Sequence, residues 1–283
     1  MASEHEYIST RYGNFGKSSR KRLDLAYDYE SAEIEIFHSV LKLIKPSILF
    51  DIGANIGLYT IYSSQIESIK NIYAYEASPG TFSELAHNIQ IQQQTASRTG
   101  FIPRQAAVSN SNKKLRFLEF KHLGGQNAVA ETTFIADETK AKSIEIESCL
   151  IDEEVELTNE TLAIKIDVEG HELQALEGMK KTLENNHCFI QIEAMKKNSA
   201  QVDTLLKDLG YTMAGWVKHD FYFHNFTDAK TQEKIQHCIF EELAHAMQDL
   251  MHLRRMRRTA LQKSKEITQI MRYKTDPVLA KGS

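Results

Sequence analysis

The chain has 283 residues, of which 42% are hydrophobic and 25% charged, with 13 glycines, four prolines, three cysteines and a net charge of −4. This composition is typical of a globular protein with a sizeable core and excludes a disordered, collagen-like or low-complexity chain. No apolar run reaches the roughly 18 to 20 residues that cross a bilayer, and the N-terminus lacks the apolar centre of a signal peptide, so we expect a cytoplasmic protein. The three cysteines include no CxxC pair and favour neither disulfides nor a zinc cluster.

From residue 47 onward, short β-type runs alternate with helical patterns. The runs are nearly continuously apolar, which is typical of a mostly parallel sheet with helices on both faces, so the sequence predicts an α/β fold. The predicted strands are 47–51, 71–76, 101–108, 143–149, 162–168 and 189–193, with an extended segment at 115–118 and a closing hairpin of 211–216 and 221–223. The predicted helices are 58–65, 81–92, 171–185 and 200–209.

A glycine-containing turn, D-I-G-A-N-I-G, joins the first strand to its helix. Gly53 and Gly57 allow a tight turn and a close approach of a ligand to the backbone, while Asn55 tolerates positive φ. Glu76 ends the second strand, where an acid is placed to bind two ribose hydroxyls. The pattern predicts a nucleotide-type cofactor, and the alternative is a plain tight corner with Glu76 as a surface acid.

The turn differs from the dinucleotide fingerprint G-x-G-x-x-G, because it has G-x-N-x-G with Asp51 ahead of the first glycine. An acid at this place would repel a pyrophosphate. S-adenosylmethionine (SAM) carries an ammonium, a sulfonium and a ribose but no phosphate. The turn therefore favours SAM, and a dehydrogenase is disfavoured.

Polar side chains also follow the later strands. Asp167, Glu169 and His171 alternate after one strand, and Glu193 ends the next. Methyl transfer to a hydroxyl needs alignment and an acceptor for the proton, so these four residues are candidate catalytic groups. Alternatively, Asp167, Glu169 and Glu193 hold a divalent cation such as Mg²⁺ that acidifies the hydroxyl. In the alternative without a catalytic role, Asp167 or Glu169 only caps the next helix and His171 lies on the surface. Lys165, if it is buried, needs Asp167 or Glu193 as a partner.

These segments resemble the FkbM family of SAM-dependent methyltransferases. The K-I-D-V-E-G-x-E run is more particular to that family than the glycine turn, which indicates only a class I methyltransferase. The resemblance is carried by LFDIGANIGLYT (49–60), YAYEASPGTFSELAHNI (73–89), QAAVS (105–109), LAIKIDVEGHELQALEGM (162–179) and IQIEA (190–194).

The resemblance implies a Rossmann-like class I methyltransferase sheet with helices on both faces, SAM as methyl donor and a hydroxyl acceptor, commonly on a sugar. It places residues 167–171 on the acceptor side and Glu76 at the ribose. The residues that it places around SAM are Asp51, Gly53, Ala54, Asn55, Gly57 and Ala107. The polar stretch 121–142 is a candidate lid over the acceptor.

The predicted organisation is an N-terminal segment (1–29), a methyltransferase domain (30–226), a long amphipathic helical extension (227–276) and a tail (277–283) that resembles a cloning remnant. Residues 252–274 contain eight Lys and Arg residues and one acid, so the rest of the chain is strongly acidic. An acidic body argues against nucleic acid as a partner.

Three interpretations of the extension stay open. The apolar spacing suits a coiled coil that makes a homo-oligomer. The arginines suit peripheral contact with an anionic membrane at the inner face or with glycan-assembly proteins. In the third interpretation, the extension packs back on the domain.

The sequence thus predicts a SAM-dependent O-methyltransferase that acts on a sugar hydroxyl of a polysaccharide or glycolipid. The alternatives are a non-sugar natural product or phosphate as acceptor, or a non-catalytic SAM-binding scaffold.

Overall fold

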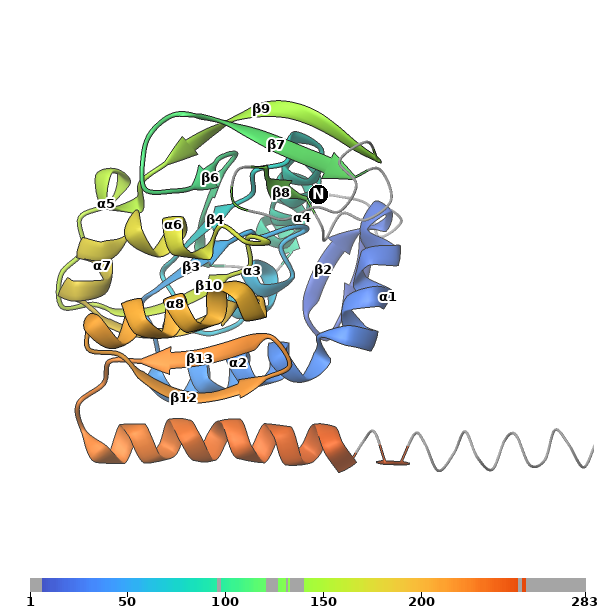
Figure 1. The fold of residues 1–283 in the computed structure, drawn as a ribbon. Helices are drawn as coiled ribbons and strands as arrows, with labels where there is room; N and C mark the ends of the chain where they lie inside the picture. Colours follow the sequence, from blue (N-terminus) through green and yellow to red (C-terminus); the bar gives the residue numbers. More distant parts are fainter. Residues whose placement is uncertain are drawn as a thin grey trace, which may run out of the picture. The chain divides into compact units, whose positions relative to one another are not determined.

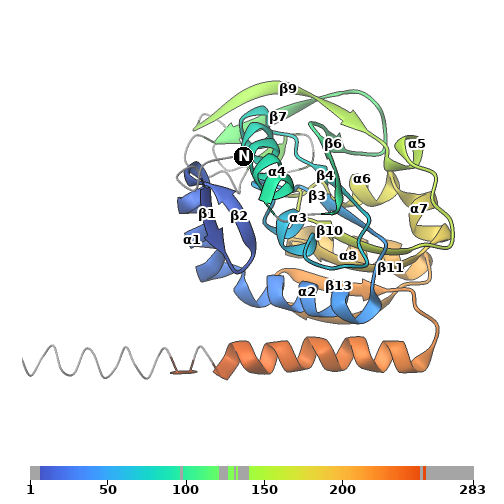
Figure 2. The same ribbon diagram turned by 180° about the vertical axis from the view of Figure 1, so that it is seen from behind.

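The structure is a computed structural model that describes residues 7–95, 98–120, 127–130, 132, 140–248 and 251–252. Residues up to Ile239 form one compact unit, and residues from Phe240 onward form a second. Figures 1 and 2 show the first unit from opposite sides, with a central sheet covered by helices.

Among the described residues, seven strands form the central sheet. They are β3 (Ile48–Ile52), β4 (Asn71–Tyr75), β5 (Gly100–Arg104), β10 (Thr161–Ile166), β11 (His187–Glu193), β12 (Thr212–Val217) and β13 (Asp220–His224). Their order is β12-β13-β11-β10-β3-β4-β5, and β13 pairs antiparallel with both of its neighbours while the remaining pairs are parallel. The predicted α/β fold and the closing hairpin are confirmed. The order reverses between β3 and β10, where ligands of such sheets bind at the carboxyl ends of the strands.

Two sets of helices cover the sheet: α2 (Ser31–Ile44), α3 (Leu58–Ser63) and α4 (Pro79–Thr95) on one face, and α6 (Glu172–Glu177), α7 (Lys180–Asn185) and α8 (Lys196–Asp208) on the other. Alternating strand side chains reach opposite faces. On the first face Phe37 of α2 packs on Phe189 and Tyr59, with ring centroids 5.9 and 5.4 Å apart. On the other face Ile164 and Ile190 belong to one buried cluster with the apolar residues of α6, α7 and α8.

A second sheet of four strands lies among the described residues: β6 (Ala107–Val108), β7 (Lys114–Phe120), β8 (Ala128–Val129) and β9 (Ala141–Cys149), in the order β6-β9-β7-β8. The short helix α5 (Ile151–Glu154) follows it. The prediction of one strand over 101–108 was wrong, because β5 ends at Arg104 and Ala107 pairs with Ser148 of β9 instead. This change of sheet carries the chain over the carboxyl end of the central sheet.

The helix predicted over 171–185 is divided into α6 and α7 at Gly178. A Cβ atom on this glycine would lie 1.9 Å from the carbonyl oxygen of Ser109. The loop after β6 therefore lies against the helix backbone, and the helical pattern in the sequence gave no sign of that contact.

The N-terminal segment contains elements that the sequence did not predict: a hairpin of β1 (Tyr7–Thr10) and β2 (Gly13–Gly16), the 3-10 turn η1 (Lys17–Ser19) and the helix α1 (Arg20–Tyr29). The hairpin is fastened to α4 by side chains, since Asn88 Oδ1 accepts from Gly16 N at 2.8 Å and Gln92 Oε1 accepts from Asn14 N at 3.1 Å. These elements belong to the first compact unit.

The predicted C-terminal helix is present over residues 229–248 and 251–252. Ile235 and Ile239 are buried, whereas Phe240, Met247 and Met251 are exposed. The basic cluster of residues 254–274 lies outside the described residues, so oligomerisation and membrane contact through it stay predictions. No helix in the described part of the chain has both the length and the apolar character needed to cross a bilayer.

Candidate active site

The glycine turn brings the end of β3 against the ends of its two neighbouring strands. Gly53 has a φ of +82°, and the amides of Gly53 and Ala54 donate to the carbonyl oxygen of Tyr75 at 2.9 and 2.8 Å. A Cβ atom on Gly53 would lie 1.8 Å from the carbonyl oxygen of Asp167, which follows β10. Gly57 has a φ of +89°. The tight turn is as predicted, and Gly53 lets the backbone of Asp167 approach it closely, whereas the approach of a ligand stays a prediction.

Glu76 closes one side of this turn. Its Oε2 accepts from the amide of Asn55 at 2.9 Å, and its Oε1 accepts from the amide of Ser78 at 2.8 Å. The side chain is 8% exposed, and burial raises its pKa to about 7. Each carboxylate oxygen keeps a second lone pair, so Glu76 has the capacity to accept from two hydroxyls, and its contact with a ribose stays a prediction.

Asp51 was predicted to face the cofactor, and the structure gives its carboxylate a partner inside the fold. Its Oδ2 accepts from the backbone amide of Thr60 at 2.9 Å and from the hydroxyl of Thr60 at 2.6 Å. The residue is 1% exposed, and burial raises its pKa to about 6. Asp51 therefore fixes helix α3 beneath the turn, and its direct contact with a cofactor stays a prediction.

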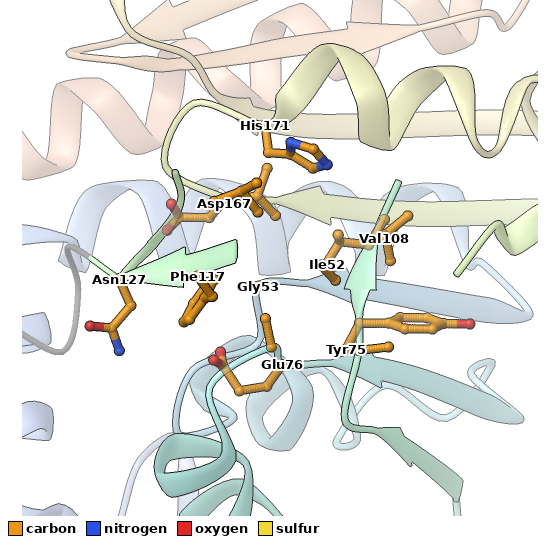
Figure 3. Close-up of a pocket in the computed structure, with 14 residues that line it drawn as sticks. Ile52, Gly53, Tyr75, Glu76, Val108, Phe117, Asn127, Asp167 and His171 are labelled. Carbon is orange, nitrogen blue, oxygen red and sulfur yellow. The ribbon is translucent and has the colours of Figure 1, made fainter. Parts of the chain in front are cut away.

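A pocket opens at the carboxyl ends of β3, β4 and β10 and is closed by residues of the second sheet. Figure 3 shows Glu76 on one side of it and Asp167 with His171 on the opposite side. The predicted residues that line this pocket are Gly53, Glu76, Ala107, Asp167 and His171. The predicted residues outside the lining are Asp51, Ala54, Asn55, Gly57, Glu169 and Glu193.

His171 occupies the N-cap position of helix α6 without a capping hydrogen bond from its side chain, and it has a hydroxyl at each ring nitrogen. Its Nε2 lies 3.0 Å from Ser109 Oγ, and its Nδ1 lies 3.1 Å from Thr132 Oγ1. The ring is 3% exposed, so the suggestion that it lies on the surface is wrong. These contacts tie α6 to the loops of the second sheet, and a role for His171 as a base stays a prediction.

Asp167 is the predicted carboxylate that lines the acceptor side of the pocket. Its Oδ2 lies 4.0 Å from Lys165 Nζ, and it accepts a hydrogen bond from Glu193. Burial raises the pKa of Asp167, while Lys165 and the hydrogen bond oppose the increase. The charge of Asp167, together with burial, raises the pKa of Glu193 to about 9, so the two carboxyl groups share a proton.

Glu169 lies in the turn after β10 with a φ of +51°. Burial and the nearby Asp167 raise its pKa to about 8. Among the described residues, no group of three His, Cys, Asp or Glu side chains is arranged to bind a metal. The Lys165 ammonium next to Asp167 would also repel a divalent ion. The geometry thus gives no support to Mg²⁺ held by Asp167, Glu169 and Glu193.

The sequence analysis missed Asp220, which begins β13. Its Oδ1 accepts from Lys165 Nζ at 2.9 Å. Asp220 is therefore a nearer partner of Lys165 than Asp167, which the sequence analysis had considered together with Glu193. Its pairing with Glu193 across the antiparallel strands places it at the carboxyl edge. The pocket residues of the second sheet, Phe117 and Asn127, were also missed as individual site residues.

The central sheet has seven strands, and β13, the second strand from one edge, is antiparallel to both of its neighbours. A glycine turn and an acid lie at the ends of the neighbouring strands β3 and β4. Together these features define the class I methyltransferase fold. The sequence profile described as "Methyltransferase FkbM domain" matches residues 51–213, more than half of the chain. The chain belongs to this family, and the predicted resemblance is confirmed.

Similar proteins include the hexuronic acid methyltransferase AglP of Haloferax volcanii, 29% identical over 148 residues that cover 52% of this chain and 56% of AglP. Methyltransferase 1 of Beauveria bassiana is 22% identical over 215 residues, 68% of this chain and 83% of that protein. A crystal structure of Methyltransferase FkbM from Methylobacillus flagellatus KT has 14% identity and a TM-score of 0.46, covering 64% of this chain and 43% of that one. The chain thus spans little more than half the length of AglP.

Proposed function

We propose that this protein is a SAM-dependent O-methyltransferase that acts on a sugar hydroxyl of a polysaccharide or glycolipid. The observation that carries the proposal is the pair of carboxylates on opposite sides of one pocket, Glu76 and Asp167. Glu76 is held by backbone amides and suits a ribose, whereas Asp167 lies beside a buried lysine and suits a proton acceptor.

The cofactor side of the pocket fits SAM better than a dinucleotide. Gly53 lines the pocket, and its lack of a side chain lets the backbone carbonyl of Asp167 lie against the turn. The buried acids Asp51 and Glu76 give this side of the pocket a negative charge that would disfavour the pyrophosphate of a dinucleotide. When bound, SAM supplies a methyl group activated by its sulfonium, and the group passes to the acceptor oxygen.

On the acceptor side, Asp167 takes the proton that the hydroxyl releases. Burial makes its carboxylate a stronger base than an ordinary aspartate. The charge of Lys165 and the hydrogen bond with Glu193 oppose this increase in pKa and favour the charged form of Asp167. The apolar side chains Phe117 and Val129 of the second sheet line the same pocket and limit the access of water.

The sugar acceptor is supported by the name of the Haloferax volcanii relative, a hexuronic acid methyltransferase. The acceptor side of this chain carries several carboxylates, which disfavour a charged uronate group next to Asp167 and favour a neutral hydroxyl. We therefore expect an O-methyl ether as the product.

The proposal is tested in two steps. Calorimetry is expected to show micromolar binding of SAM and no binding of NAD⁺ at the same concentration. The absence of SAM binding by folded protein would contradict the proposal.

In the second step, methyl-labelled SAM is incubated with the protein and with neutral glycosides, uronides or a lipid-linked glycan extract, and the products are treated with mild alkali. Label that resists alkali on a neutral sugar supports an ether, and label released by alkali indicates an ester. Label on a phosphate or polyketide would identify a non-sugar acceptor, and a protein that binds SAM but never transfers label would be a scaffold.

A further inference from the structure

One face of the central sheet carries polar side chains in two neighbouring rows across β10, β11 and β13. Lys165 is in register with Gln191, and Gln191 with Tyr222. One pleat closer to the carboxyl edge, Glu193 is in register with Asp220. Residues in register point to the same face, so these side chains lie together under helices α2 and α3. Buried polar rows of this kind are costly in a core and require an explanation.

Lys165 lies at the centre of this polar region and is 3% exposed. Its Nζ is 2.9 Å from Asp220 Oδ1 and 4.0 Å from Asp167 Oδ2, and it lies 5.1 Å from the ring centre of Tyr59. Asp220 Oδ1 also accepts from Gln191 Nε2 at 2.7 Å. Asp220, which is outside the pocket lining, is therefore the nearer partner of the ammonium, while Asp167 receives its field at a longer distance.

Burial alone would lower the pKa of Lys165, but the carboxylates of Asp220 and Asp167 outweigh this effect and raise it. Lys165 therefore stays charged. A buried ion pair adds little stability compared with apolar side chains of the same volume, so stability does not explain the pair. The position of the pair explains it, because Lys165 lies two residues before Asp167, whose carboxylate lines the pocket.

Several other ionisable groups lie near this region, and they are mostly acidic. Apart from Lys165, Asp167 and Asp220, the groups that interact electrostatically with these residues include Glu30, Asp51, Tyr59, Glu169, Glu172, Glu193 and Tyr222, and Glu33 interacts in turn with Glu30 and Tyr222. In such surroundings the Lys165 ammonium opposes the repulsion that Asp167 receives from its neighbours.

We propose that Lys165, anchored by Asp220, is a positioning residue that holds the carboxylate of Asp167 in place and in its charged form on the acceptor side of the pocket. This inference rests on the proposed role of Asp167 as the proton acceptor. Lys165 lies outside the pocket lining and acts through Asp167.

The first test measures the pair without cofactor or acceptor. Urea unfolding is followed for the wild type, Lys165→Met, Asp220→Asn and the double variant. Each single variant leaves a buried charge without its partner and is expected to lower the unfolding midpoint clearly. The double variant removes both charges and should have a midpoint nearer the wild type than either single variant has. Additive losses would show that the two residues are not coupled and would overturn the proposal.

The second test separates positioning from stability. In the double variant, the affinity for SAM and the KM for acceptor should stay within about threefold of the wild type, while kcat falls about tenfold to a hundredfold. Lys180→Met is the matched control, since Lys180 is an exposed lysine paired only loosely with Glu184 at 3.8 Å, and it should leave kcat unchanged. Recovery of kcat together with stability in the double variant would overturn the proposal.

These outcomes also separate this inference from the proposed function. A wild-type protein that neither binds SAM nor transfers its methyl group would contradict the proposed function, whatever the unfolding data show. A wild-type protein that methylates its acceptor, combined with a fully active double variant, would contradict only the role of Lys165 and Asp220.

Discussion

The two sides of the pocket are built in different ways. On the cofactor side the contacts are made by the backbone: Glu76 is held by two amides, and Gly53 donates to a carbonyl of the neighbouring strand. On the acceptor side the contacts run between side chains, with Lys165 shared between Asp220 and Asp167. The cofactor side is thus fixed by the course of the chain, and the acceptor side by the identity of each residue.

This difference predicts how each side responds to mutation. A backbone-built site depends on a few conformations, and changes there are expected to affect folding and cofactor affinity together. A side-chain network has partners that can be removed one at a time, and changes there are expected to affect the chemical step with cofactor affinity kept.

The largest effect is expected for Gly53→Ala. The new Cβ atom would lie 1.8 Å from the carbonyl oxygen of Asp167, at a φ of +82° that alanine rarely adopts. We expect loss of SAM binding by calorimetry and a free energy of unfolding reduced by several kcal/mol, more than about 3 kcal/mol. Gly80→Ala is the matched control, because a Cβ atom there meets nothing within 4 Å and alanine favours helix α4. A Gly53→Ala protein that binds SAM normally would break the comparison.

Asp167→Asn is expected to have the next largest effect. The amide keeps the shape of the side chain but cannot accept the hydroxyl proton, so kcat should fall about a hundredfold or more. The dissociation constant for SAM should change by less than about threefold, since Glu76 and the turn are the proposed contacts of the cofactor. Single-turnover kinetics and calorimetry on the same sample measure both quantities. A loss of SAM affinity that matches the loss of rate would show that the two sides are not separate.

Glu76→Gln should give the opposite result, with SAM affinity about tenfold weaker and little change in kcat at saturating SAM. The pKa of Glu76 is about 7, so its carboxylate gains a proton as the pH falls from 8 to 6 and loses acceptor capacity for ribose hydroxyls. SAM affinity of the wild type should therefore weaken over this range, while the affinity of the variant stays flat. Calorimetric titrations with SAM at several pH values measure this dependence. A variant whose SAM affinity falls with pH as steeply as that of the wild type would exclude Glu76 as the cause.

The same difference explains what the sequence could predict. The cofactor side depends on short spacings, such as the glycines after β3 and the acid after β4, and the structure brings Gly53 and Glu76 to one pocket as predicted. The strands β3, β4, β10 and β11 were predicted because buried parallel strands are apolar runs. These features are local, so a single sequence contains them.

The features that were missed depend on contacts between distant segments. Gly178 divides a predicted helix because Ser109 lies against it, and Ala107 leaves the central sheet to pair with Ser148. Asp220 became visible as the partner of Lys165 only through the antiparallel register of β13. Such contacts join residues that are tens of positions apart, and no local pattern records them.

The smallest expected effect is that of Thr60→Val, which removes one side-chain hydrogen bond beneath the turn. The hydroxyl of Thr60 donates to Asp51 at 2.6 Å, and valine has nearly the same shape, so the free energy of unfolding should fall by about 1 to 3 kcal/mol. Burial raises the pKa of Asp51 to about 6 in the folded state, and the bond is strongest to the charged form. The loss should therefore grow as the pH rises from 5 to 8, because Asp51 ionises within that range and needs the hydroxyl more when charged.

Thr204→Val is the control for this last variant, since its exposed hydroxyl donates only to Ala200 of the same helix, and we expect a change within about 0.5 kcal/mol. Urea unfolding at pH 5 and pH 8 measures both proteins. SAM affinity of Thr60→Val should stay within about threefold of the wild type, because the backbone amide of Thr60 still donates to Asp51. A large loss of SAM affinity without a loss of stability would instead place Asp51 in contact with the cofactor, as the family resemblance implied.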